Sequence, residues 1–495
     1  MARAKGIRGS RWHERVTRRQ FLHKTALAGA GLAAAVVGCG GGEEQAATPS
    51  AGTPAPAVLR GTELKILTWG HFVPRYDREW FDSFVQAWGD ANGVRVTVDH
   101  IAAAEIRSRA VAEISAGAGH DIIQFNFPPA DLEPNLLDLT DVIREAERRF
   151  GAQIPLATKS SFNPKTGVVF GLVKGWGINA GSYRRSMWER VGLANGPTTW
   201  QELLEGGRRI RREQGVQVGL GLSPAIDSEF SSLSVLWSFG ASVQDERENV
   251  VINSSRTVEA VEFMAQLFRD AMTPEVFGWT PPSNNQALVA GTASYILNPY
   301  TAYRTAQKDR PDVAVDIFFR PALRGPTGVA LASAGDVHVM VVPKFSRNPA
   351  AAREFLLHYL ANMDQAVWYS ELFELPAFPD APLLSGDRGY PPVQGARTIR
   401  DIINAWFDND PFRLDREERG KLGPLKDADR WTVAVGHPGP TNAAQGEVYS
   451  TFLVTQMFAK AARGELSPRD AVADAERQIV AIYRKWRERG LVGGN

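Results

Sequence analysis

The chain contains one cysteine, Cys39, at the end of a segment whose residues suit export and lipid attachment. Arg18 and Arg19 lie in a basic stretch, and residues 26–37 form an apolar run of 12 residues. A bilayer span takes about 20 residues, so this pattern is typical of a secretory signal peptide. The adjacent arginines are typical of the twin-arginine export route. Residues 36–39 (VVGC) match a lipoprotein box, in which the cysteine thiol carries the lipid.

A lipidated Cys39 leaves the mature chain without a free thiol. This excludes disulfides, thiolate metal sites, iron–sulfur clusters and cysteine nucleophiles. The 8 histidines are scattered along the chain, so no local histidine metal site is indicated. We therefore expect neither a metal nor a cofactor. The several acyl chains of a bacterial lipoprotein would give a stable membrane anchor.

Sequence motifs of common hydrolases and nucleotide-binding proteins are absent. There is no G-x-S-x-G and no H-E-x-x-H, and the stretch 219–224 (GLGLSP) lacks the third glycine of a dinucleotide loop. A pair of carboxylates suffices for glycoside hydrolysis, and the chain has 55 acidic residues. An exported glycoside hydrolase therefore remains an alternative.

Composition divides the chain into three parts. Residues 1–38 would be the signal peptide, and residues 39–60 are small and proline-rich, which predicts a flexible tether. Residues 1–38 hold 8 of the 56 Lys and Arg and 1 of the 55 Asp and Glu, which leaves 48 basic against 54 acidic residues, a net charge of −6. A mildly acidic body argues against a nucleic-acid partner. The remaining length suits two domains.

The first part of the body alternates between strand and helix patterns. Residues 63–69 (ELKILTW), 94–98 (VRVTV) and 120–125 (HDIIQF) read as strands separated by helices. This order predicts a parallel sheet with ligands near the carboxyl ends of its strands, where Trp69 and Asn126 would lie.

Later segments continue the α/β pattern. Thr199 and Glu202 have the spacing of a capping box, and Ser254 is a predicted N-cap. Further patterns predict strands at 292–297 and 336–344, a helix entered through residues 348–349, and two or three helices in the last 50 residues.

These segments together resemble one family, the extracytoplasmic solute-binding proteins of ABC transporters (family 1), which include maltose-binding-type proteins. The resemblance runs in order along the mature chain. Its motifs are Cys39, residues 64–69, residues 120–125, Ile178-Asn179, residues 197–203, residues 287–300 (ALVAGTASYILNPY) and residues 341–378.

The resemblance implies an α/β, two-lobe, periplasmic-binding-protein-like (type II) fold with a hinge and a ligand cleft between the lobes. Residues 61–172 plus 334–377 would form the N-terminal lobe, and residues 173–333 plus 378–495 the C-terminal lobe. It also implies a monomer, lipid-anchored to the outer face of the cytoplasmic membrane, that delivers its solute to the transmembrane subunits of an ABC permease and performs no chemistry. A sensory lipoprotein with the same fold remains a second alternative.

A sugar or related polyhydroxy solute is the expected ligand. Sugars need flat aromatic faces for their C–H surfaces and planar polar groups for their hydroxyls. Candidates for these roles lie at strand ends or, by the resemblance, in the loop after residue 297; they are Trp69, Asn126, Trp176, Trp237, Trp279, Asn298, Tyr300 and Asp336. No cluster of Lys or Arg lies among them, which favours a neutral solute over a phosphorylated one.

Replacement of Cys39 by serine tests the lipid anchor. Serine provides no thiol for acylation, so the Cys39→Ser protein should leave the membrane fraction, whereas a Ser50→Ala control in the tether should stay in it. Immunoblots of washed membranes measure the distribution. Tight membrane retention of Cys39→Ser would contradict the assignment.

Overall fold

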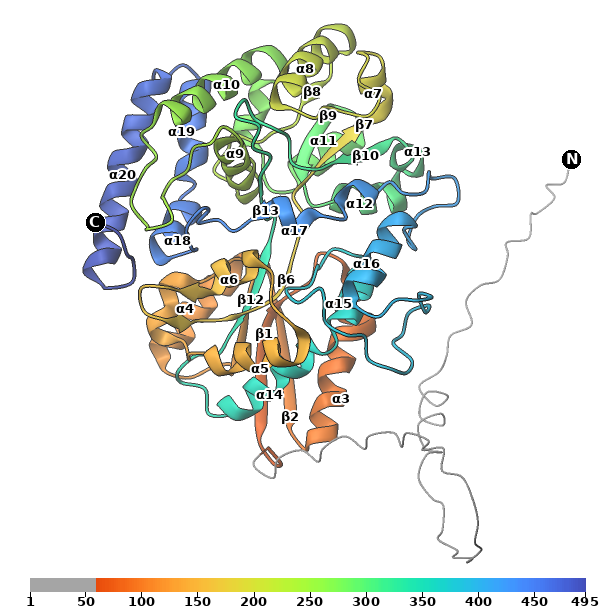
Figure 1. Cartoon of the computed structure of the whole chain (residues 1–495), viewed down its shortest axis with the longest axis vertical. Helices are drawn as coiled ribbons and strands as arrows, with labels where there is room; N and C mark the ends of the chain where they lie inside the picture. The colour runs from red at the N-terminus through yellow and green to blue at the C-terminus, as the bar shows by residue number, and fades with distance from the viewer. Residues whose placement is uncertain (1–58) are drawn as a thin grey trace, which may run out of the picture. The chain divides into compact units, whose positions relative to one another are not determined.

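Two β-sheets organise residues 59–495, the part of the chain that the computed structural model describes (Figure 1). Cys39, Arg18 and Arg19, together with nearly all of the predicted tether, lie outside these residues. We call the parts built on the first and the second sheet the N-terminal and C-terminal lobes. Within residues 59–495, no helix has the length and apolar character needed to cross a membrane.

The first sheet has five strands in the order β2-β1-β3-β12-β6. Its strands are β1 (Glu63–Trp69), β2 (Arg95–Ile101), β3 (Ile122–Phe125), β6 (Leu172–Trp176) and β12 (Val337–Val341). Strand β1 is parallel to both of its neighbours, β2 and β3, as the sequence predicts, and its bounds are those predicted. The later strand β12 pairs antiparallel with β3 and β6, so the sheet is mixed.

Helices and short elements cover this sheet. They are α2 (Pro74–Tyr76), η1 (Asp77–Phe81), α3 (Asp82–Asn92), η2 (Ala103–Glu105), α4 (Ile106–Ala116), η3 (Ala130–Asn135), α5 (Thr140–Phe150), α6 (Pro155–Ser161), α14 (Pro349–Leu360) and α15 (Met363–Tyr369), with the hairpin β4 (Phe162–Asn163) and β5 (Val168–Val169). Helix α14 packs on β1 and β6, and α4 packs on β1 and β3. The N-terminal lobe is thus assembled from two chain regions.

The second sheet has four strands in the order β10-β7-β9-β8. Its strands are β7 (Ala180–Arg184), β8 (Gln217–Val218), β9 (Ala293–Asn298) and β10 (Ile317–Arg320). Around it lie α7 (Arg185–Glu189), α8 (Trp200–Gln214), α9 (Ile226–Ser238), α10 (Ser255–Ala271), η4 (Pro274–Gly278), α11 (Ser283–Ala290), α12 (Thr301–Asp309) and α13 (Pro311–Ala314). The C-terminal helices α18 (Ala443–Ser450), α19 (Leu453–Ala462) and α20 (Pro468–Glu488) return to this lobe, where α19 packs on α9 and α10.

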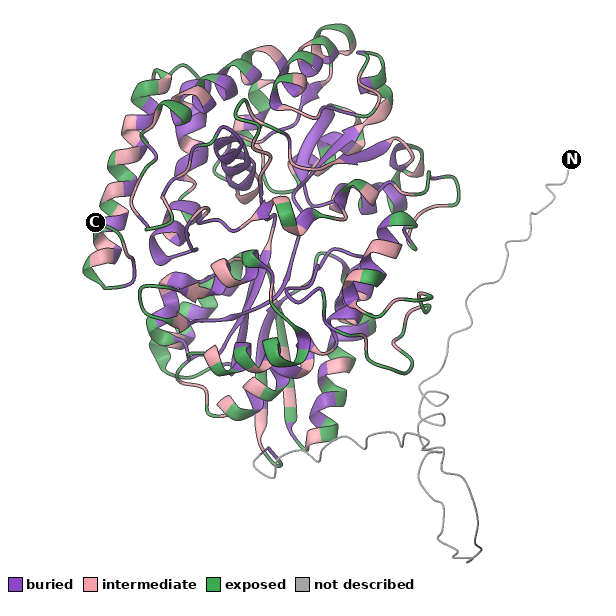
Figure 2. Ribbon diagram, in the orientation of Figure 1, coloured by how far each residue is buried: buried purple, intermediate pink, exposed green. Residues whose placement is uncertain are grey.

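Helix α9 is the most buried helix of the C-terminal lobe (Figure 2). Every residue from Ser228 to Ser238 is buried. Serines of this helix bond either to the helix itself or to a neighbour: Ser234 Oγ donates to Phe230 O at 2.7 Å, and Ser232 Oγ lies 3.1 Å from Thr455 Oγ1. A helix with paired serine hydroxyls can therefore sit in the core.

Three segments connect the lobes and bond to one another. Gly177 N donates to Asp336 O at 2.9 Å, and Gly335 N donates to Gly177 O at 3.1 Å. The third segment joins through Leu375, whose backbone exchanges hydrogen bonds of 3.0 and 2.9 Å with Trp176. A Cβ on Gly335 would lie 2.6 Å from Pro299 Cγ, so glycine is required there. These segments form the predicted hinge.

The chain beyond the third segment forms short elements at the level of the hinge (Figure 1). They are α16 (Ile399–Asp408), η5 (Gly423–Leu425), α17 (Ala428–Trp431) and the strand β13 (Thr432–Val433), which pairs with β11 (Ala332–Ser333). Strand β6 belongs to the first sheet, although the lobe boundary predicted after residue 172 would divide it.

The predicted helix start at Thr199 is confirmed in part. Thr199 Oγ1 accepts a hydrogen bond from Glu202 N at 3.0 Å and caps α8. The Glu202 carboxylate, however, accepts from Thr198 N at 2.6 Å rather than from the N-cap residue. The bond to Thr198 thus takes the place of the second half of the predicted capping box. The predicted N-cap at Ser254 is confirmed at the start of α10.

Candidate functional site

A cleft of about 580 Å³ lies between the two lobes. Its N-terminal-lobe wall comes from Phe72, residues 103–107 and residues 125–131, and its C-terminal-lobe wall comes from residues 224–226, 279–281 and 446–452. Ligand sites of proteins usually enclose about 300 to 1,000 Å³. The cleft is therefore large enough for a small solute and touches both lobes.

Aromatic side chains dominate the walls of the cleft. Phe72 is 51% exposed, and its ring lies 4.6 Å from that of buried Trp69. Trp279 faces the cleft from the other lobe and is half-buried. Phe127 of the N-terminal lobe stacks on Tyr449 of α18, with ring centroids 4.3 Å apart and planes within 3°. This stack joins the lobes at one side of the cleft.

A polar group built on α9, α11 and β9 lies behind the C-terminal-lobe wall. Asp227, in the first turn of α9, accepts a hydrogen bond of 3.2 Å from Asn284 Nδ2. Asn298 Nδ2 donates to Asn285 Oδ1 at 2.6 Å and to Asn284 Oδ1 at 3.3 Å. Burial and then the nearby Asp336 raise the pKa of Asp227 to about 8, although the Asn284 bond opposes this.

Asp336 belongs to the hinge and is half-buried. Burial, followed by repulsion from Glu374, raises the pKa of its carboxyl to about 7, and His71 opposes the shift only weakly.

Tyr449 completes this polar region. Its side chain is 4% exposed. Burial and then the charges of Asp336, Glu229 and Asp227 raise its pKa well above the usual value. The hydroxyl therefore stays protonated at neutral pH.

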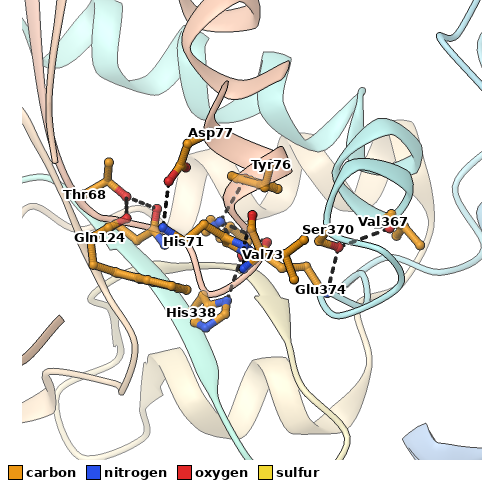
Figure 3. Close-up of polar contacts among 12 residues, drawn as sticks. Thr68, His71, Val73, Tyr76, Asp77, Gln124, His338, Val367, Ser370 and Glu374 are labelled. Atoms are coloured by element: carbon orange, nitrogen blue, oxygen red, sulfur yellow. Dashed lines mark hydrogen bonds and ion pairs between the residues drawn. The ribbon is translucent and has the colours of Figure 1, made fainter. Parts of the chain in front are cut away.

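A buried ionic cluster around Glu374 supports the N-terminal-lobe wall (Figure 3). Glu374 pairs with Lys174 of β6 at 2.7 Å, and both side chains are almost completely buried. Tyr359 donates to Glu374 at 3.3 Å, and Lys174 Nζ donates to the Tyr76 hydroxyl at 3.0 Å. Burial alone would raise the pKa of Glu374, but Lys174 first, and then the histidines beside it, hold the pKa well below its usual value.

Two histidines complete the Glu374 cluster. His338 Nδ1 lies 2.9 Å and His71 Nε2 lies 3.3 Å from the Glu374 carboxylate. Val73 N donates to His71 Nδ1 at 2.9 Å, which leaves the His71 proton on Nε2. Burial lowers the pKa of both imidazoles, so they are neutral at neutral pH. His71 also stacks on Trp69 at 5.0 Å and so fixes the ring that supports Phe72.

Positive charge is scarce at the cleft. Of the residues in the described chain that line it, Arg107 alone is a lysine or arginine, and its guanidinium pairs with Asp131, which lines the cleft as well. Residues 59–495 contain no group of three or more His, Cys, Asp or Glu arranged to hold a metal ion.

The structure brings some of the predicted site residues to the cleft. Asn126 and Trp279 line it directly. Asn298 belongs to the polar group behind it, Trp69 supports Phe72, and Asp336 lies in the hinge.

The other three predicted residues pack in cores. Trp176 donates to Pro376 O at 3.2 Å beside the hinge. Trp237 lies 5.6 Å from the ring of His437, and Tyr300 packs on Phe319. All three are buried and none lines the cleft.

Sequence reasoning missed several residues of the cleft. Phe72 and Phe127 are each within three residues of a predicted strand end, so the rule that located Trp69 and Asn126 could have included them. Ile226 lies at the start of α9, two residues after the stretch 219–224, where the sequence shows no ligand-binding motif. Tyr449 lies on a C-terminal helix, and no local pattern connects it to the cleft.

Comparison with known proteins agrees with this geometry. Residues 82–390 match the family model described as bacterial extracellular solute-binding protein. Three Brucella proteins, from B. abortus and B. suis and each named as a binding protein, are 21% identical over 164 residues. That match covers 33% of this chain and 39% of each relative's length.

Solved structures are similar over nearly the whole described body. Maltose-bound MalE3 of Thermotoga maritima has 19% identity and a TM-score of 0.65, over 85% of this chain and 100% of that one. A sugar transporter protein of Arthrobacter chlorophenolicus with bound laminaribiose has 17% identity and a TM-score of 0.64, over 85% and 99%. MalE of Xanthomonas citri has 15% identity and a TM-score of 0.65, over 86% of this chain and 98% of that one. These matches confirm the predicted fold, and the family match confirms a binding protein rather than an enzyme.

A double-mutant cycle tests the ionic cluster. Lys174→Met leaves the Glu374 charge buried without a partner, which should lower the free energy of unfolding by roughly 3 to 5 kcal/mol. Lys174→Met combined with Glu374→Gln leaves no buried charge and should recover most of that loss. Urea unfolding measures both. A double variant as unstable as the single one would show that the charge is not the cause.

Asp336→Asn should stabilise the ligand-free protein. An unfolded aspartate has a pKa of about 3.9, whereas the folded carboxyl has a pKa of about 7. Between these values the folded state keeps a proton that the unfolded state releases, so stability falls as pH rises. Asparagine removes this penalty, and the gain should grow from near zero at pH 4 to roughly 1 to 4 kcal/mol at pH 8. Thermal melting across this range checks it; a gain independent of pH would contradict the assignment.

Proposed function

The chain belongs to the bacterial extracellular solute-binding proteins, and we propose that it captures a sugar or related polyhydroxy solute outside the cytoplasmic membrane and delivers it to an ABC permease. The observation that carries the proposal is the composition of the cleft. Phe72 and Trp279 offer flat apolar faces from opposite lobes, and Asn126 offers a planar polar group in the same cleft. A sugar presents both kinds of surface.

In this proposal, closure of the hinge around the solute links solute binding to transport. A ligand that touches both lobes stabilises the closed form in proportion to its difference in affinity for the two forms. The three hydrogen-bonded segments around Gly177 and Gly335 are the elements that would bend. The Phe127–Tyr449 stack is a contact that forms or breaks as the lobes move.

Bound sugars in structural relatives support the solute class. Maltose in the Thermotoga protein and laminaribiose in the Arthrobacter protein occupy proteins of the same fold. The paired Arg107 leaves no free cation on the cleft wall of the described chain for a phosphate group, which agrees with a neutral rather than a phosphorylated sugar.

Location at the membrane is part of the same proposal. Export through Arg18 and Arg19 and lipidation of Cys39 would place the folded body at the outer face of the cytoplasmic membrane, next to the permease. The lobe ranges 61–172 plus 334–377 and 173–333 plus 378–495 would be the two rigid bodies, apart from the division of β6.

A ligand screen tests the function, with Trp279→Ala as the diagnostic variant. Thermal melting of the purified protein against mono- and oligosaccharides, polyols, sugar phosphates and peptides should show a saturable rise with a sugar. Loss of the Trp279 ring should weaken that binding roughly tenfold. Trp431→Ala removes an equally half-buried tryptophan outside the cleft and should leave the affinity unchanged.

Two results would contradict the proposal. One is the absence of any melting shift across all saccharides and polyols. The other is chemical turnover of a bound sugar, which would restore the hydrolase alternative. Chromatography of the same samples detects the product.

A further inference from the structure

The walls of the cleft are mainly apolar on both lobes. Phe72, Ile106 and Phe125 lie on the N-terminal-lobe wall, and Ile226 and Phe452 lie on the C-terminal-lobe wall, together with alanines and prolines. Aromatic rings can stack on a sugar, but isoleucine and alanine side chains offer it neither a flat face nor a hydrogen bond. The apolar part of the cleft is therefore larger than sugar stacking requires.

The polar side chains of these walls are few, and most of them are bonded within the protein. They are Arg107, Asn126, Asp131, Thr280, Tyr449 and Ser450. Arg107 and Asp131 pair with each other. Ser450 Oγ donates to Glu447 O at 3.2 Å, and the Thr280 hydroxyl lies 3.1 Å from that of Ser283. The charges on the described walls therefore neutralise each other, which suits a neutral ligand.

Two polar side-chain groups on the walls have no hydrogen bond within residues 59–495. They are the amide of Asn126 and the hydroxyl of Tyr449, which line the cleft from opposite lobes. An amide supplies donors and an acceptor, and a hydroxyl supplies one donor. Together they match a few hydroxyls of one sugar ring. A second sugar ring would bury further hydroxyls against apolar walls, and each buried hydroxyl without a partner is costly.

Phe72 is held in the cleft as an exposed apolar ring. It is 51% exposed, whereas the two rings beneath it, Trp69 and Phe373, are almost completely buried. The Phe72 ring lies 4.6 Å from that of Trp69 and 5.9 Å from that of Phe373. These neighbours fill the space into which Phe72 could otherwise fold. Exposed apolar surface of this kind marks a place where a ligand with apolar surface binds.

We propose that the solute is a glycoside with an apolar aglycone: one sugar ring bonded by Asn126 and Tyr449, and an aromatic or aliphatic group packed against Phe72 and Ile226. This inference rests on the proposed function and specifies its substrate class. A single sugar ring would fill only part of a cleft of about 580 Å³. An apolar group fills the rest of the cleft without bringing in hydroxyls that the walls cannot bond.

Matched ligand pairs test the inference on the purified protein. The pairs are phenyl β-glucoside and cellobiose, phenyl α-glucoside and maltose, and phenyl β-galactoside and lactose. Both members of a pair have the same first sugar ring and the same anomeric linkage, and a phenyl group replaces the second sugar ring. In at least one pair the phenyl glycoside should bind roughly tenfold tighter or more. Calorimetry at several temperatures should also give it the more negative heat-capacity change, which is the mark of apolar burial.

Variants of the walls assign the preference to particular side chains. Phe72→Gln and Ile226→Thr should each weaken the phenyl glycoside roughly fivefold more than the disaccharide, because each replaces apolar wall by a polar group. Asn126→Ala should weaken both members of a pair by the same factor. Leu384→Gln is the control for Phe72→Gln, since Leu384 is 46% exposed and lies outside the cleft, and it should keep the preference. Melting curves show whether each variant is folded.

The outcomes separate this inference from the proposed function. If sugars bind but every disaccharide binds as tightly as its phenyl partner or more tightly, the inference is overturned and sugar binding stands. A phenyl preference that survives both Phe72→Gln and Ile226→Thr would overturn it as well. Failure of all the sugars and all the phenyl glycosides to bind would overturn the proposed function together with the inference.

Discussion

The buried charge of Glu374 is the constraint on which the cleft depends. A buried carboxylate is tolerated only when a cation and hydrogen-bond donors surround it. Lys174 comes from β6, His338 from β12, His71 from the loop after β1, and Glu374 from the third hinge segment. Satisfying this one charge therefore holds together the strands that lead into the hinge and the loop that carries Phe72. The N-terminal-lobe wall of the cleft is preorganised for this reason.

The opposite side of the cleft is built in the reverse way. Asp227 and Asp336 are partly removed from water with few partners, and burial raises the pKa of both. Such an arrangement lowers the stability of the empty protein and leaves free energy that a ligand with complementary donors can recover. Binding sites commonly show this conflict between stability and function. Glu374 is thus a buried and satisfied charge, whereas Asp227 and Asp336 are half-buried and have raised pKa values.

Local patterns predicted the fold better than they predicted the site. The strand at residues 63–69 is confirmed to the residue, and the N-caps at Thr199 and Ser254 are confirmed, because alternation and capping act within a few residues. The position of Asn126 at the cleft could also be predicted locally, since ligands bind at the carboxyl ends of parallel strands. Trp176 does not line the cleft because β6 pairs with β12, a partner about 160 residues away that sequence alone does not identify. Tyr449 reaches the cleft through the packing of the last three helices, for which no local signal exists.

The Phe127–Tyr449 stack has a consequence for closure. It joins the N-terminal lobe to α18, and both rings line the cleft. A ligand shifts the balance between the open and closed forms only by its difference in affinity for them. A ligand that contacts both walls of the cleft is bound better when the walls approach each other, so its contacts add to the free energy of closing. The interlobe contact and the ligand contact thus share the same two side chains.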